Sequence, residues 1–233
     1  MAKSAIHGSP HPIKAPRRVP TSERILDVAE ELFSRYGLAD VMLKDVAQAA
    51  GVHNTLLAYY FKDKQHLFET VITQRTPRTS ERRMAALASY EREAAGELTV
   101  EGILRAYLDT DPKPDDSGWR HYGALGAQLN ELPDSGAALI DAHFSPVVLR
   151  LVELLKKALP GCSDEDILWG CHFLRGALML SLAQPCPINK LSAGPSSCGD
   201  VDAIRDRMVL FMAAGFKYVA ANRDQSNTHK RSG

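Results

Sequence analysis

The chain has 233 residues, of which 45% are hydrophobic and 24% are charged, with 28 basic and 28 acidic side chains. This length and apolar content suffice to bury a core, which argues against a largely disordered chain, and a net charge of zero argues against a protein that coats nucleic acid indiscriminately. No apolar stretch approaches the roughly 18 residues of a membrane helix, and no signal-peptide pattern opens the chain, so we expect a cytoplasmic protein with no membrane partner.

The first predicted helix follows a segment without apolar periodicity. Residues 1–19 are rich in Pro, Gly, His and Ser and end in a basic pair, so we expect a disordered basic arm. A helix is predicted from Thr21, whose hydroxyl suits an N-cap, to Tyr36, with Gly37 ending it. Its apolar stripe has spacings of three and four residues and consists of Ile25, Ala29, Leu32, Phe33 and Tyr36.

The pattern stays helical along the rest of the chain. Glycine and proline breaks, Pro77 among them, separate the candidate helices. These helices are predicted over 43–50, 54–60, 64–75, 78–95, 99–109, 118–131, 136–158, 164–183 and 200–221. No sustained period-two alternation predicts a strand, so we expect an all-α fold. The proline-containing stretch 184–199 is expected to be an exposed, mobile connection, with a functional lid as the alternative.

Residues 43–61 have the pattern of a helix-turn-helix. Ala47 is small enough for two helices to cross, and Gly51, four positions later, tolerates the positive φ of the turn. Apolar residues fall at the positions expected to face inward, namely Val46, Ala50, Val52, Leu57 and Tyr60.

A helix-turn-helix reads DNA with the N-terminal, outward side chains of its second helix. These are His53, Asn54 and Thr55, of which Asn54 has the groups that pair with adenine. Capping of the helix by His53 is the alternative to a DNA contact, and Lys44 is either a phosphate contact or a solvated charge. The full set of candidate DNA contacts is Lys44, His53, Asn54, Thr55, Tyr59, Tyr60 and Lys64.

The segment Thr21–Ile72 resembles the DNA-binding domain of tetracycline-repressor-type (TetR family) transcriptional regulators. The resemblance rests on Asp45-Val46-Ala47, on Ala50-Gly51-Val52, and on Leu57, Tyr59, Phe61 and Lys64 in the pattern Leu-x-Tyr-x-Phe-x-x-Lys. It implies a helix-turn-helix domain over 20–72 and a helical ligand-binding and dimerisation domain over 73–222, before a disordered tail at 223–233.

Residues 120–183 are similar to the C-terminal domain of fatty-acid-responsive members of that family. The likeness rests on Glu131-Leu132-Pro133, on His143 to Val148, and on His172 to Leu178. It implies a homodimer joined through helices 164–183 and 200–221 and a small, hydrophobic effector. Helix 164–183 is apolar nearly all round, which is typical of burial on two faces.

Aromatic and polar residues on otherwise apolar helices are candidates for the effector cavity. They are Trp119, Tyr122, Gln128, His143, Phe144, Trp169, His172 and Phe173, with His121 beside them. Core packing is the alternative for each.

No motif indicates catalysis or a bound metal. The eight histidines and four cysteines show no zinc-ligand spacing, and no phosphate-binding glycine loop or nucleophile elbow occurs. We therefore expect no cofactor, no metal and no enzyme activity, but a ligand-responsive regulator, a repressor rather than an activator. Because Met42, Thr55 and Ala58 depart from the family pattern, a helical small-molecule-binding protein without specific DNA recognition is the alternative, with a helical enzyme as a further one.

Overall fold

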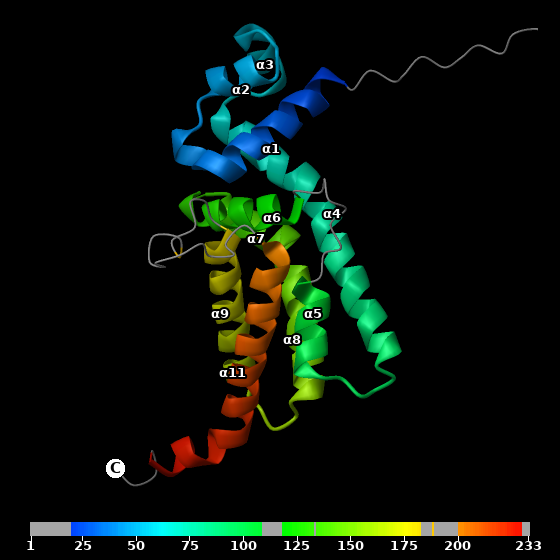
Figure 1. Ribbon diagram of the computed structural model, residues 1–233. Helices are drawn as coiled ribbons and strands as arrows, with labels where there is room; N and C mark the ends of the chain where they lie inside the picture. The colour runs from blue at the N-terminus through cyan, green and yellow to red at the C-terminus, as the bar shows by residue number, and fades with distance from the viewer. Residues whose placement is uncertain (1–19, 109–117, 133, 183–187, 189–199, 230–233) are drawn as a thin grey trace, which may run out of the picture.

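The computed structural model describes residues 20–108, 118–132, 134–182, 188 and 200–229 (Figure 1). Within these ranges the regular elements are helices, which confirms the predicted all-α fold. In chain order they are α1 (Thr21–Asp40), α2 (Leu43–Ala49), α3 (Asn54–Tyr60), α4 (Lys64–Glu93), α5 (Val100–Leu108), α6 (Gly118–Gln128), η1 (Leu129–Glu131), α7 (Gly136–His143), α8 (Ser145–Ala158), α9 (Asp164–Leu182) and α11 (Val201–His229). The predicted arm at 1–19 and most of the predicted connection at 184–199 lie outside the described residues.

The N-terminal helices form one end of the molecule (Figure 1). Ile25 and Phe33 of α1 and Phe68 of α4 are fully buried there, and the rings of Phe33 and Phe68 meet edge to face with centroids 5.3 Å apart. Burial of each such side chain contributes roughly 1.5–3 kcal/mol. The same core continues into Leu125 of α6 and Leu129 of η1, so this end is packed directly on the rest of the chain.

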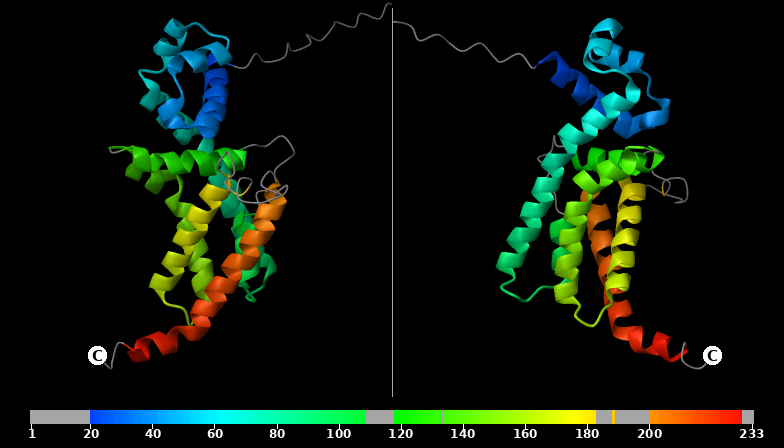
Figure 2. Two further views of the ribbon diagram at one scale, coloured as in Figure 1. Left: turned by 60° about the vertical axis from the view of Figure 1, so that its left-hand side comes forward. Right: turned by 180° about the vertical axis from the view of Figure 1, so that it is seen from behind.

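The other end is a helical bundle of α5, α8, α9, α11 and the second half of α4 (Figures 1 and 2). α6 lies across the top of this bundle, between it and the N-terminal helices (Figure 2). The bundle core consists of apolar side chains that include Ile103, Leu104, Leu151, Leu155, Ile167, Leu174 and Phe216.

α4 continues through Pro77, where the sequence predicted a break. A proline inside a helix removes one backbone hydrogen bond and crowds the preceding turn. Here Ile72, Thr76 and Thr79, on both sides of Pro77, are buried against neighbouring helices, and Thr76 Oγ1 donates a hydrogen bond to the carbonyl oxygen of Ile72 at 2.6 Å. Tertiary packing therefore outweighs the local cost of the proline, and one continuous helix joins the two ends of the molecule.

Two other predicted helix boundaries are wrong. The helix predicted over 136–158 is split at Phe144 into α7 and α8, because Pro146 favours the first turn of a new helix. The first helix begins at Thr21 as predicted, with Pro20 and not Thr21 as its N-cap, but α1 resumes after the non-helical Gly37 (φ 86°) and ends at Asp40 instead of Tyr36.

α11 is longer than its sequence pattern predicted. It was expected to end at residue 221, before a disordered tail at 223–233, yet it continues to His229. No glycine or proline occurs between 216 and 229 to end it, so loss of the apolar stripe alone did not mark a helix terminus.

Candidate DNA interface and effector cavity

The α2–α3 pair has the turn that the sequence predicted. Gly51 takes φ +62°, and the backbone N–H of Val52 donates to the carbonyl oxygen of Ala47 at 2.9 Å, which closes the turn. Ala47 and Leu57 are almost fully buried between the helices. Tyr60, predicted to face inward, is instead 40% exposed, because it lies in the last turn of α3 and points off the motif core.

We expect Gly51→Ala to destabilise the protein by about 1–2 kcal/mol, the cost of a side chain in the left-handed region. A Cβ at Gly51 meets open space, so this cost is conformational and not steric. Gly161→Ala is the matched control, because a Cβ there also meets open space and its φ is not positive. Urea unfolding of both variants measures the difference, and equal free energies of unfolding would contradict the role of the turn.

α3 lies at the far end of the molecule (Figure 1), and its N-terminal side chains and one aromatic ring are exposed to solvent. Asn54 and Thr55 are exposed, and Tyr59 is 82% exposed. His53 is the N-cap of α3, with Nδ1 accepting the backbone N–H of Thr55 at 3.3 Å and lying 2.9 Å from Thr55 Oγ1. This exposed set is brought together on one helix, as direct readout of base edges requires.

The two predicted phosphate-binding lysines have different surroundings. Lys44 is exposed in the first turn of α2. Lys64 is half-buried, and its Nζ donates to the carbonyl oxygen of Ala39 at 3.0 Å, near the C-terminus of α1. Lys64 therefore joins the start of α4 to the end of α1.

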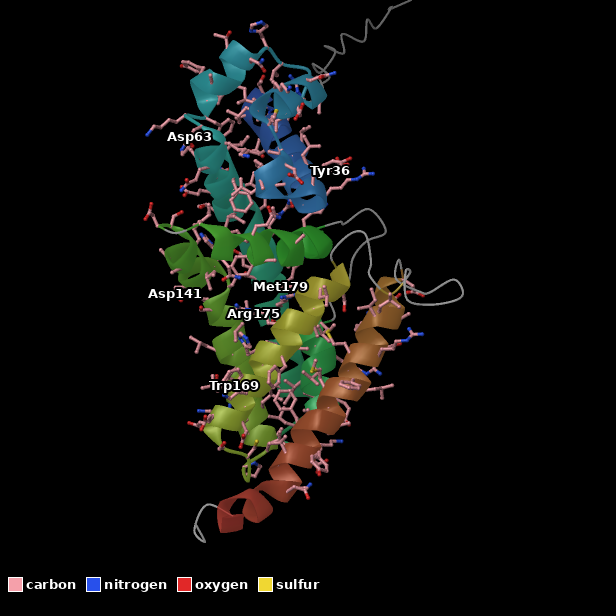
Figure 3. The ribbon with its side chains drawn as sticks, turned by 90° about the vertical axis from the view of Figure 1, so that its left-hand side faces the viewer. Tyr36, Asp63, Asp141, Trp169, Arg175 and Met179 are labelled. Atoms are coloured by element: carbon pink, nitrogen blue, oxygen red, sulfur yellow. The ribbon has the colours of Figure 1, made fainter. Side chains whose placement is uncertain are left out.

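A small, partly open cavity lies among α4, α5, α6, α8 and α9. It is lined by Arg83, Tyr107, Gly123, Phe144, Val148, Arg175, Leu178 and Met179. The cavity has a volume of about 20 Å³, which is little more than a single water molecule needs. Figure 3 places Arg175 and Met179 on the part of α9 nearest α6, and it places Trp169 on the part of α9 farther from α6.

Of the predicted effector contacts, Phe144 lines this cavity, while Gln128 and His143 lie outside its lining. Gln128 Nε2 donates to the carbonyl oxygens of Phe33 and Ala124, and its Oε1 accepts the N–H of Leu38. Burial lowers the pKa of His143, so its ring is neutral at pH 7. Trp119 and Tyr122 belong to α6, and their side chains lie outside the described residues.

Three further predicted cavity residues lie on the outer surface of α9. Trp169 and Phe173 are 53% and 59% exposed, and His172 is exposed between them. Trp169 and Phe173 border an apolar groove of about 370 Å³ between α9 and α11, on the opposite wall from Phe211 and Met212. Within the described residues, the structure thus places these side chains on an exposed face of α9 and not in the cavity.

Sequence reasoning missed Arg83 and Arg175. Arg83 is 1% exposed, and its guanidinium carbon lies 4.8 Å from the ring centre of Tyr107. A signal was present, because Thr76, Thr79, Arg83 and Leu87 continue one buried stripe at helical spacing. A charged residue in such a stripe indicates an interior polar site.

Among the described residues no cluster of three or more metal-ligating side chains occurs. Cys171 is buried, which raises the pKa of its thiol to about 12 and makes it unreactive at neutral pH. No helix in the described ranges combines the length and hydropathy of a membrane span.

Two family models match the chain. The model of bacterial regulatory proteins of the tetR family matches residues 25–71, and that of the tetracyclin repressor-like C-terminal domain matches residues 101–215. The HTH-type transcriptional regulator AcrR of Shigella flexneri is 43% identical over 51 residues, which are 22% of this chain. This match spans only 24% of that regulator's length.

Solved structures support the fold over most of the chain. The TetR-family regulator SCO4454 of Streptomyces coelicolor has a TM-score of 0.57 at 18% identity, covering 86% of this chain and 96% of that one. A TetR-family regulator of Bordetella parapertussis has a TM-score of 0.57 at 19% identity, covering 82% and 93% of the two chains.

Proposed function

Because this chain belongs to the TetR family of DNA-binding transcriptional regulators, which are not enzymes, we propose that it is a homodimeric repressor released from a near-palindromic operator by a small, largely hydrophobic effector. The observation that carries the proposal is the exposed face of α3, where Asn54, Thr55 and Tyr59 lie on one short helix that follows the turn at Gly51. A regulator that binds chromosomal DNA acts in the cytoplasm, and this is the location we propose.

The dimer is supported by an apolar surface on α9 and α11. Its exposed large side chains are Leu168, Trp169, Phe173, Leu180, Leu210, Phe211, Tyr218 and Val219. Contiguous exposed apolar surface is typical of an interface, and a two-fold axis through this surface would pair each groove with its copy. A symmetric dimer carries two recognition helices, which fits half-sites about 34–36 Å apart.

Release by an effector is supported by the elements that line the cavity. α4 and α6 both contribute to the cavity wall, through Arg83 and Gly123. Both helices also contact α1, α4 through ion pairs and α6 through hydrogen bonds. Arg75 of α4 pairs with Glu23 and Asp27 of α1 at 3.0 and 2.7 Å. An effector that expands the cavity would shift both helices and thereby move α1 and the reading helix, with a coupling of about 1–3 kcal/mol.

DNA binding is tested by titrating the full chain with labelled duplexes from around its own gene at several salt concentrations. We expect saturable binding to one duplex, with an affinity that falls steeply as salt increases because phosphate contacts release counterions. Equal, weak binding to every duplex would favour the alternative, a small-molecule-binding protein without specific DNA recognition.

Two substitutions separate base reading from phosphate contact. Asn54→Ala is expected to change the preferred base at one position of each half-site, at a cost of about 1–3 kcal/mol on the original site. Lys44→Ala is expected to weaken all duplexes alike and to reduce the salt slope by about 1 per half-site contacted. Selection of bound duplexes from a randomised site library, done with each variant, distinguishes them, and identical effects would contradict these roles. His53, Thr55, Tyr60 and Lys64 remain proposed contacts.

A further inference from the structure

We propose that the effector is an organic anion, with an apolar body and a carboxylate-type group held between Arg83 and Arg175. This inference deepens the proposed function and rests on its claim that the cavity among α4, α5, α6, α8 and α9 receives an effector. Among the described residues that line the cavity, the only charged ones are these two arginines. They come from different helices, α4 and α9, and converge on one space.

The first step is the charge of the cavity. An arginine side chain stays protonated inside proteins, so both guanidinium groups carry charge. Arg83 is 1% exposed and Arg175 is half-buried, so water screens neither charge fully. Two positive charges that line a cavity of low dielectric constant attract an anion far more strongly than the same charges would in water.

The second step is the shape of the wall. The face of the Tyr107 ring supports Arg83, with the guanidinium carbon 4.8 Å from the ring centre. Stacking of this kind holds the planar guanidinium in place, with its N–H groups directed along its own plane. A carboxylate or a phosphate accepts two such parallel N–H groups on two different oxygens and carries a negative charge, whereas an amide or an alcohol offers one neutral acceptor oxygen.

The third step is the apolar remainder of the lining. Phe144, Val148, Leu178 and Met179 supply apolar contacts, and Gly123 presents no side chain from α6. Methionine side chains adapt to different shapes, so Met179 suits a wall that must move when the cavity fills. The site therefore fits a molecule with an anionic group at one end and a compact hydrocarbon body.

The test uses matched probes and the full chain without DNA, so its result does not depend on operator binding. The probes are hexanoate and phenylacetate, their primary amides, and hexyl phosphate, each titrated calorimetrically up to about 10 mM. We expect at least one anion to bind and its amide to bind at least about 10-fold more weakly, as charged hydrogen bonds imply. Stronger binding of hexyl phosphate than of hexanoate would identify phosphate as the group held and would support the same anionic site.

Variants locate the binding. Arg175→Gln keeps a hydrogen-bond donor without the charge and is expected to weaken anion binding by about 10–100-fold. Arg82→Gln removes an exposed charge next to Arg83 on α4 and is expected to leave it unchanged. Arg83→Gln should act as Arg175→Gln does, and Arg175→Gln still decides the matter if that variant fails to fold. Three results would overturn the inference: equal binding of acid and amide, no binding of any anion, or unaltered anion binding by Arg175→Gln. Failure of the parent chain to bind an operator would count only against the proposed function.

Discussion

Phe211→Glu is expected to convert the proposed dimer into a monomer and to abolish tight operator binding. Phe211 is 80% exposed on α11 and borders the groove that Trp169 and Phe173 face from α9. In a two-fold dimer each substitution occurs twice. If each aromatic anchor contributes about 2 kcal/mol or more, the dimer loses at least about 4 kcal/mol, which is roughly a thousand-fold in its dissociation constant.

Sedimentation of the parent chain and the variant across a range of concentrations measures this loss. Leu149→Glu is the matched control, because Leu149 is also a large exposed apolar side chain, 65% exposed, but lies on α8 away from the groove. We expect the control to sediment as the parent does and to bind the same duplex. A Phe211→Glu protein that still sediments as a dimer would show that the α9–α11 face is not the interface.

Gln128→Ala is expected to destabilise the protein by about 1–3 kcal/mol and to uncouple effector binding from DNA release. Gln128 of α6 is 9% exposed and bridges two backbone groups of α1, at Phe33 and Leu38. Gly37 has non-helical backbone angles within α1, and the N–H of the next residue, Leu38, donates to Gln128 Oε1 at 2.6 Å. Alanine would remove that partner from the buried carbonyl oxygen of Phe33 and from the partly buried N–H of Leu38.

Thermal unfolding gives the stability change, and operator titrations with and without a releasing compound give the coupling. The parent is expected to lose about 5–150-fold in affinity when the compound binds, and Gln128→Ala to lose much less. Asn130→Ala removes an exposed amide two residues further along, in η1, whose bond is to the carbonyl oxygen of Ala127, and it should leave both quantities unchanged. Full coupling in Gln128→Ala would mean that the signal passes through α4 alone.

The DNA-binding end could be predicted from the sequence because its determinants are local. Ala47 and Gly51 are four residues apart, and both act through the backbone geometry of one turn. The apolar spacing then fixed which sides of α2 and α3 are buried, apart from Tyr60 in the last turn of α3. Family membership and the all-α fold followed from the same short-range patterns.

The positions of the predicted effector contacts could not be read in the same way. α9 is apolar on two faces, and periodicity does not distinguish the face that packs into the core from the face that the proposed dimer would bury. The sequence predicts Trp169 and Phe173 as cavity residues from their aromatic character, whereas α9 presents them to solvent and presents Arg175 to the cavity. The two faces of α9 are distinguished only by the tertiary structure, in which α11 lies beside α9.

Hydrogen bonds between residues far apart in the sequence also could not be predicted from local patterns. Gln128 and Leu38 are 90 residues apart, and Lys64 and Ala39 are 25 apart, so no spacing rule links them. The sequence predicted Lys64 as a phosphate contact, while its hydrogen bond shows that it also ties α4 to α1. Such bonds arise from the way α6 and α4 cross α1.

The most direct test of the account is selection of duplexes from a random library by the full-length chain, followed by footprinting of the selected site. We predict one enriched near-palindrome whose half-sites lie about 10 base pairs, or a multiple of one helical turn, apart, protected by two copies of the chain. Enrichment of no sequence over the starting library at low salt, with the protein folded and dimeric, would contradict the claim that α3 reads DNA.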